Sequence, residues 1–230
     1  LALALVNQQR ARIIVAPYQP APGFWFGGGN LIETPDGVFY LVGRYRNAGD
    51  SRAGIAVGER GMELAVFASR DRGRSFEKVL SFSKSDLDVG NHKVLSIEGS
   101  ALHQTSDGFE LFISSEKDHT GYPTGFEDYL KPGTGVWSID RIAARTIDGL
   151  RNAPRVTTLQ SRDPRFIHVK DPLLYERSDG ALMLLFCSHP YCWTSSNTGY
   201  AVRQRGCESY EEPVFEFFAR GFTWDVAMTR

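Results

Sequence analysis

The chain has 230 residues, of which 42% are hydrophobic and 23% are charged, and its formal net charge is −1. This composition predicts one compact globular body with a sizeable core. Because Lys and Arg are scattered along a nearly neutral chain, we expect no nucleic-acid partner and no binding to an anionic membrane.

The opening segment and the cysteines bear on the compartment of the protein. Residues 1–6 are apolar but too few for a membrane span or a complete signal peptide, so they are the end of a processed signal or a β-strand. Cys207 could form a disulfide with Cys187 or Cys192 in an oxidising compartment, and three reduced thiols fit equally well. Their spacing matches no zinc site, so we expect no metal and no cofactor. We expect a secreted or periplasmic protein rather than a cytoplasmic one.

The first unit of the chain is predicted to be a β-hairpin followed by two further strands. Asp36-Gly37 separates two β-rich runs, a strong hairpin signal because the tight turn needs the positive φ that glycine adopts freely. Segments 63–68 and 77–82 are the two further strands. The unit therefore has four strands.

The turn before the last of these strands, residues 69–76, reads Ser-Arg-Asp-Arg-Gly-Arg-Ser-Phe. It resembles the Asp-box of sialidases and related propellers, Ser-x-Asp-x-Gly-x-Ser/Thr-Trp/Phe. In such a turn the Asp71 carboxylate accepts backbone N–H groups, and Phe76 anchors the turn on the sheet. We expect Asp71 to be structural and remote from an active face.

The Asp-Gly hairpin recurs twice, as Asp107-Gly108 and Asp179-Gly180, at intervals of 71 (36 to 107) and 72 (107 to 179) residues. A four-stranded unit that recurs at such a spacing predicts an all-β fold, a β-propeller, because propeller blades have four strands and close into a ring. A β-sandwich with chance hairpins is the alternative.

The predicted ring is incomplete within this chain. One domain spans 1–230, with blades at 24–90, 91–165 and 166–221 and the start of a fourth at 222–230. A closed propeller needs four or more blades. Either this chain is a fragment, or a second chain or a missing segment completes the ring.

Acidic residues recur where the innermost strand of each blade is expected to start. These starts are predicted near Asn30, Glu98 and Asp171, and Asp225 lies at the corresponding place in the last segment. Because the innermost strands all line the central channel, we expect the acids to share one pocket.

At this point the chain resembles the five-bladed propeller glycosidases, the superfamily of arabinanases, xylosidases and invertases. Glu98-Gly99-Ser100 resembles the motif that bears the general acid in that superfamily, and Asp171-Pro172 resembles its Asp-Pro motif. The chain differs in having Gly-Gly-Gly-Asn at 27–30, where the superfamily usually has an Asp base, and in the order of the two motifs. The resemblance implies hydrolysis of O-glycosidic bonds in an oligosaccharide or polysaccharide by paired carboxylates.

Three acids are the predicted catalytic residues. We expect Glu98 to be the acid, because its neighbours Ile97, Gly99 and Ala101 are uncharged and should raise the pKa of its carboxyl group. Asp171 follows Lys170 and should stay ionised. Asp225 could replace the acid that the first blade lacks.

Sugar binding requires aromatic rings for stacking and polar side chains for hydroxyl groups. Residues of these types near the expected strand ends are the predicted substrate-binding set, namely Trp25, Asn30, Arg44, His189 and Trp193. The long segment 116–134 is expected to be a lid or an interface, with His119, Tyr122 and Asp128 within reach of the channel mouth.

Two other functions remain open from the sequence. A sialidase-like, six-bladed hydrolase would need three arginines around a substrate carboxylate, for which Arg44, Arg46 and Arg203 are available. A non-catalytic, carbohydrate-binding propeller is favoured if the missing first-blade Asp means that the catalytic machinery has decayed.

Overall fold

A computed structural model describes residues 7–47 and 60–216 of the chain. Three subjects of the sequence analysis lie outside the described residues: the apolar opening at 1–6, the start of a further blade at 222–230, and Asp225.

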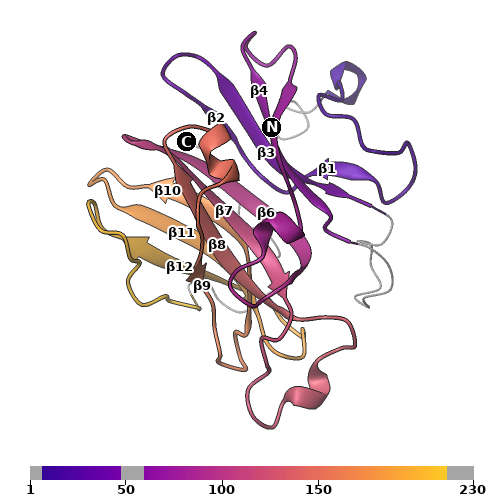
Figure 1. Ribbon diagram of the computed structural model, residues 1–230, viewed down its shortest axis with the longest axis vertical. Helices are drawn as coiled ribbons and strands as arrows, with labels where there is room; N and C mark the ends of the chain where they lie inside the picture. The colour runs from indigo at the N-terminus through magenta and orange to yellow at the C-terminus, as the bar shows by residue number, and fades with distance from the viewer. Residues whose placement is uncertain (1–6, 48–59, 217–230) are drawn as a thin grey trace.

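The described residues form three antiparallel sheets, which follow one another in space as they do in sequence (Figure 1). The first sheet consists of β1 (Trp25–Gly27), β2 (Leu31–Glu33), β3 (Phe39–Arg46), β4 (Glu63–Ser69) and β5 (Glu77–Ser83). The second consists of β6 (Val94–Thr105), β7 (Gly108–Lys117), β8 (Val136–Ala144) and β9 (Arg155–Leu159), and the third of β10 (His168–Glu176), β11 (Leu182–His189) and β12 (Asn197–Arg203).

In residues 7–47 and 60–216, helical structure is confined to short 3₁₀ segments, η1 (Gln8–Arg10), η3 (Ser85–Leu87), η4 (Glu127–Tyr129) and η5 (Asp148–Arg151). Within the described ranges, no helix is long and apolar enough to cross a membrane. The all-β prediction is confirmed.

The number of strands in each unit departs from the uniform four. The second sheet has four strands, but the innermost strand of the first sheet is split into β1 and β2, which both pair with β3. The third sheet has three strands, and its outer edge is extended by one bridge between Tyr200 and Val214. None of the sheets closes on itself, so each behaves as a separate layer.

All three Asp-Gly hairpins are present, as predicted. They join β2 to β3, β6 to β7 and β10 to β11, and Gly37 and Gly180 have φ of +80° and +79°. Since neighbouring strands are antiparallel, the loops that follow β3, β7 and β11 lie at the opposite end of the sheets from these hairpins. The loop 118–135, which contains η4, is therefore at the same end as the first residues of the innermost strands.

Alternation along the strands places one core on each side of the second sheet. Leu111 and Ile113 of β7 pack against the first sheet, whereas Phe112 between them packs against the third. The period of two residues sends successive side chains to opposite faces. The second sheet is thus buried on both sides, between the first and the third sheet.

The innermost strands are interrupted at equivalent positions. β1 and β2 are separated by residues 28–30, the pairing of β6 with β7 shifts between Ile97 and Ser100, and that of β10 with β11 shifts between Lys170 and Leu173. The expectation that strands start near Glu98 and Asp171 is therefore wrong, because both acids lie within strands, at bulges. A bulge turns a side chain out of the regular alternation, which is why bulges occur next to active sites.

The turn at 69–76 is organised by one carboxylate. Oδ1 of Asp71 accepts the N–H groups of Arg74 and Ser75, each at 2.9 Å, and its Oδ2 accepts the hydroxyl of Ser75 at 2.6 Å. These bonds, led by the one from the Ser75 hydroxyl, lower the pKa of Asp71. Phe76 packs against the core cluster on the outer side of the first sheet.

Replacement of Asp71 with Ala should lower the thermal midpoint by a few degrees, because two backbone N–H groups and the hydroxyls of Ser69 and Ser75 lose their acceptor. Activity per folded molecule should not change, since this turn is at the hairpin end of the first sheet. Calorimetry and an assay on the folded fraction measure both effects. A loss of turnover at an unchanged midpoint would instead place Asp71 in the active site.

Candidate active site

Two carboxylates from neighbouring sheets meet at one ammonium group. Nζ of Lys170 lies 3.8 Å from Oε1 of Glu98 and 3.8 Å from Oδ2 of Asp171. The two oxygens therefore cannot be farther apart than twice this distance, which is within the range of about 5–9.5 Å for paired catalytic carboxyl groups. The predicted convergence of Glu98 and Asp171 is present in the structure.

The close approach of these acids depends on backbone conformation. Asp171 has φ of +58°, a value that costs energy for a residue with a side chain, and its Oδ1 accepts the N–H of Gly99 at 3.3 Å. A Cβ atom at Gly99 would lie only 2.7 Å from that Oδ1. Glycine at 99 thus permits the second and third sheets to approach at the site.

The first sheet also contributes to the site, through Arg44 of β3. Its guanidinium group forms an ion pair with Oε2 of Glu98, and only 2% of the Arg44 side chain is exposed. The exposed fraction of the side chain is 18% for Glu98 and 18% for Asp171. All three sheets therefore supply a charged group to a site that retains some contact with solvent.

The charges around Glu98 reverse the expected pKa shift. Burial raises the pKa of this carboxyl group, as predicted, but Lys170 and Arg44 outweigh burial and hold the pKa below its usual value. The prediction of a raised pKa is therefore wrong, because the sequence neighbours considered were uncharged while the decisive cations come from two other sheets. Glu98 is ionised at neutral pH in this arrangement.

Lys170 stays charged for the reciprocal reason. Burial lowers the pKa of its ammonium group, but the carboxylates of Asp171 and Glu98 outweigh burial and raise it. The ammonium also lies 4.9 Å from the ring centre of Trp137 and 5.9 Å from that of Trp193. A cation over an aromatic face is stabilised by the ring quadrupole.

The predicted substrate-binding residues have different surroundings. Trp25 is 42% exposed, and the guanidinium groups of Arg44 and Arg46 lie 5.7 and 5.2 Å from its ring centre. Trp25 and Arg44 therefore lie beside Glu98. His189 is fully buried, and Trp193 packs against it next to Lys170.

Asn30 joins two sheets. Its Nδ2 donates to the carbonyl oxygen of Leu102 at 2.9 Å, and its Oδ1 accepts the N–H of Leu102 at 2.8 Å. Both polar atoms of the side chain are thus bound to backbone. We assign Asn30 to the joint between the first and second sheets rather than to sugar binding.

Arg203 does not join Arg44, as a sialidase-like site would require. It lies opposite Leu182, just after the Asp-Gly turn, and its guanidinium donates to both carboxylate oxygens of Glu110 at 2.7 and 2.5 Å. This position is at the hairpin end of the sheets, the opposite end from Arg44.

Sequence reasoning missed a group of residues at the base of the loop 118–135. Oε1 of Glu116 accepts the N–H of Gly135 at 3.0 Å, and its Oε2 pairs with Arg60, so this acid ties the two ends of the loop together. Burial raises the pKa of Glu116. The hydroxyl of Tyr122 lies 2.9 Å from Nε2 of His168. Only the unusual length of the segment signalled a role in the sequence.

No metal or disulfide is built into the described part of the chain. It contains no group of three His, Cys, Asp or Glu side chains that could hold a metal ion. Cys187, Cys192 and Cys207 are free thiols, so neither of the two disulfides considered is formed.

Solved structures similar to this chain include propeller-fold glycoside hydrolases. An exo-1,5-α-L-arabinanase from a bovine ruminal metagenomic library aligns with a TM-score of 0.53 at 12% identity, over 88% of this chain and 60% of its own. A GH43 β-xylosidase/α-arabinofuranosidase from a compost metagenome, in complex with xylotriose, aligns with a TM-score of 0.53 at 9% identity, over 88% of this chain and 62% of its own. A family 117 glycoside hydrolase of Zobellia galactanivorans aligns with a TM-score of 0.52 at 9% identity, over 82% of this chain and 55% of its own.

These likenesses show the propeller fold. Neither a family model nor a curated protein sequence matches the chain. The chain spans about three-fifths of the length of the structures it resembles.

The buried histidine pair predicts how stability depends on pH. Burial lowers the pKa of His168 to about 3 and that of His189 to about 4, whereas both titrate near 6.5 when unfolded. Below pH 6.5 the unfolded chain thus binds more protons, and the stability present above that pH should fall by up to about 1.4 kcal/mol per pH unit for each histidine.

Urea denaturation at pH 7.0, 6.0 and 5.5 measures this loss, and replacement of both histidines with Gln should flatten the dependence. His119, whose side chain is 79% exposed, provides the control, because His119→Asn should leave the slope unchanged. An equal slope in the parent and the double variant would show that these histidines are not held neutral.

Proposed function

We propose that this chain is part of a glycoside hydrolase-like propeller that cleaves an O-glycosidic bond with paired carboxylates. The observation that carries the proposal is the meeting of Glu98 and Asp171 at Lys170, on bulges of neighbouring innermost strands. The separation of their carboxyl groups is compatible with this chemistry. Similarity to a xylosidase and an arabinanase supports an oligosaccharide or polysaccharide as the substrate.

The electrostatics of the site set the proposed roles. Glycoside hydrolysis needs one protonated and one ionised carboxyl group. Because Lys170 and Arg44 keep Glu98 ionised, we assign to it the part of base or nucleophile instead of the acid expected from the sequence. The proton donor is then Asp171 or Asp225, and the latter lies outside the described residues.

A five-bladed ring accounts for the length of the chain. In this proposal the three sheets are three of five blades, and a further segment or a second chain supplies the others. The chain aligns with about three-fifths of the length of each neighbour, which supports the proposal that it supplies three of five blades. The added blades would enclose the side of the site that the three sheets leave open.

One observation favours a second function, glycan binding without turnover. At the level where the second and third sheets present Glu98 and Asp171, the first sheet presents residues 28–30, which contain no acid. A protein of this kind would bind a glycan without hydrolysing it, so binding and turnover must be measured separately.

Replacement of Glu98 with Gln should preserve the fold and glycan binding but lower turnover at least about a hundredfold, as expected for loss of a catalytic carboxylate. The loss should be similar on an unactivated glycoside and on an aryl glycoside with a good leaving group, because a base or nucleophile is needed for both. Steady-state kinetics of the full-length protein measure these losses.

Glu63→Gln is the matched control, since this glutamate is also ion-paired and its side chain is 20% exposed. A loss restricted to the unactivated glycoside would return Glu98 to the role of acid. If Glu98→Gln matches the parent on both substrates, the hydrolase assignment is wrong and glycan binding takes its place.

A further inference from the structure

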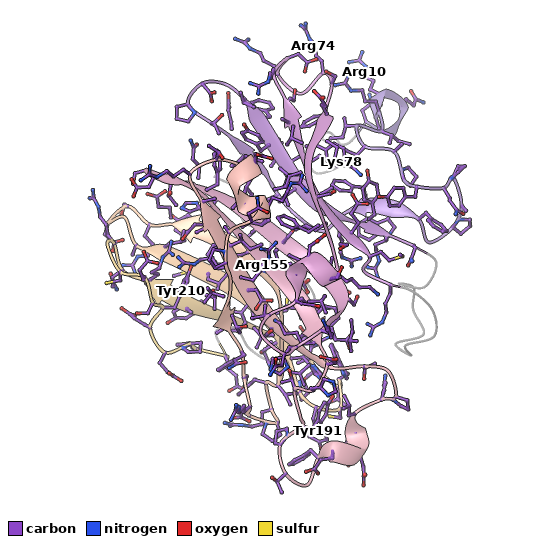
Figure 2. All side chains as sticks on the ribbon, viewed as in Figure 1. Arg10, Arg74, Lys78, Arg155, Tyr191 and Tyr210 are labelled. Carbon is purple, nitrogen blue, oxygen red and sulfur yellow. The ribbon has the colours of Figure 1, made fainter. Side chains whose placement is uncertain are left out.

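Aromatic rings extend from the neighbourhood of Lys170 to the protein surface: the inner ring stacks on His168, whose ring is 5.7 Å from that of Tyr122, and the outer rings surround Tyr122. We call this group the aromatic track, and it consists of Trp193, Tyr191, Phe126 and Tyr129. Trp193 is the inner end, 5.9 Å from the ammonium of Lys170. Figure 2 shows Tyr191 beside the loop that contains η4, at the end of the molecule opposite Arg74.

The inner ring packs on two histidines of the third sheet. The Trp193 ring is 4.2 Å from that of His168 at 24°, and 4.7 Å from that of His189 at 34°. These histidines are directly opposite each other on β10 and β11, where side chains are about 5 Å apart. The indole therefore packs against both histidines of this pair.

Trp193 is held in a costly conformation. Its φ is +57°, in a region that bulky residues rarely adopt. Strain of this kind persists only where the surroundings enforce it, and it concentrates at ligand sites. The two neutral histidines and the half-buried position of the indole supply that enforcement.

The loop 118–135 fixes the outer rings. The hydroxyl of Tyr122, which is buried, bonds to His168, and Phe126 and Tyr191 pack against the core cluster around Tyr122. The ring of Tyr191 is 4.5 Å from that of Phe126 and 4.6 Å from that of Tyr129. Rigid rings lose little conformational entropy when a ligand stacks on them.

The outermost ring is accessible. Tyr129 is 52% exposed although it belongs to this packed group. Large exposed aromatic side chains next to a functional site are typical of binding surfaces. The track therefore begins at Trp193, beside the ammonium group that both carboxylates approach, and ends in solvent.

We propose that the aromatic track binds the sugar residues that extend beyond the bond cleaved at Glu98 and Asp171. The apolar faces of pyranose or furanose rings stack on such aromatic surfaces, and the phenol hydroxyl groups can bond to sugar hydroxyls. This inference rests on the proposed function and makes it more specific. The substrate is a chain of several sugars, and Tyr129 sets the preference for length.

The test compares xylohexaose and arabinohexaose with xylobiose and arabinobiose, using the full-length protein. Binding is measured by calorimetry with the Glu98→Gln variant, and KM is measured with the parent. Tyr129→Leu keeps an apolar contact with Tyr191 but has no aromatic face. It should lower the affinity for the hexasaccharide at least threefold. Affinity for disaccharides should not change.

Two further variants separate the ring from general surface effects. Tyr129→Phe retains the ring and should keep most of the hexasaccharide affinity. Tyr18→Leu is the matched control, because Tyr18 is 55% exposed and stacks on Tyr45 in the first sheet. This substitution should not change the affinity for any of the four oligosaccharides.

The outcomes separate this inference from the proposed function. Tyr129-dependent binding without turnover would support the track and reject hydrolysis. Turnover with the same KM for long and short substrates, in both parent and Tyr129→Leu, would overturn the track and leave hydrolysis intact. Failure of the parent to bind either hexasaccharide more tightly than its disaccharide would also overturn it.

Discussion

The ammonium group of Lys170 is the interaction on which the site depends. It neutralises two carboxylates that could not otherwise share a partly buried space, and it does so between the second and third sheets. Arg44 adds the first sheet to the same charge cluster. Burial of charge is costly unless the charges are paired, so the cluster constrains how the three sheets can pack.

Breaks in the innermost strands make this cluster possible. A regular strand would alternate its side chains between the two cores, whereas the bulges at Glu98 and Asp171 turn charged groups out of that alternation. Contacts between sheets repeat with the spacing of the sequence repeat. Asn30 bonds to Leu102 and Gly99 bonds to Asp171, in each case 72 positions apart. Equivalent positions of successive units therefore touch, which brings distant acids to one level.

The sequence predicted the features that local rules determine. Asp-Gly turns located the hairpins, and their spacing identified the repeat and the meeting of Glu98 with Asp171. It could not predict the pKa of Glu98, because Arg44 and Lys170 are far from it in the chain and only packing makes them neighbours. The bonds of Asn30 to the backbone of Leu102 escaped prediction for the same reason, since Leu102 belongs to another sheet. The bulges also escaped prediction, because no residue type marks them uniquely.

The most direct test of this account is the titration of the Glu98 carboxyl group by ¹³C NMR in the parent and in a Lys170→Met variant. Methionine keeps the length of the side chain over Trp137 but removes the charge. We expect the pKa of Glu98 to rise in the variant, because burial would then act with less opposition. An unchanged pKa in a folded variant would contradict the claim that Lys170 holds the Glu98 carboxylate ionised.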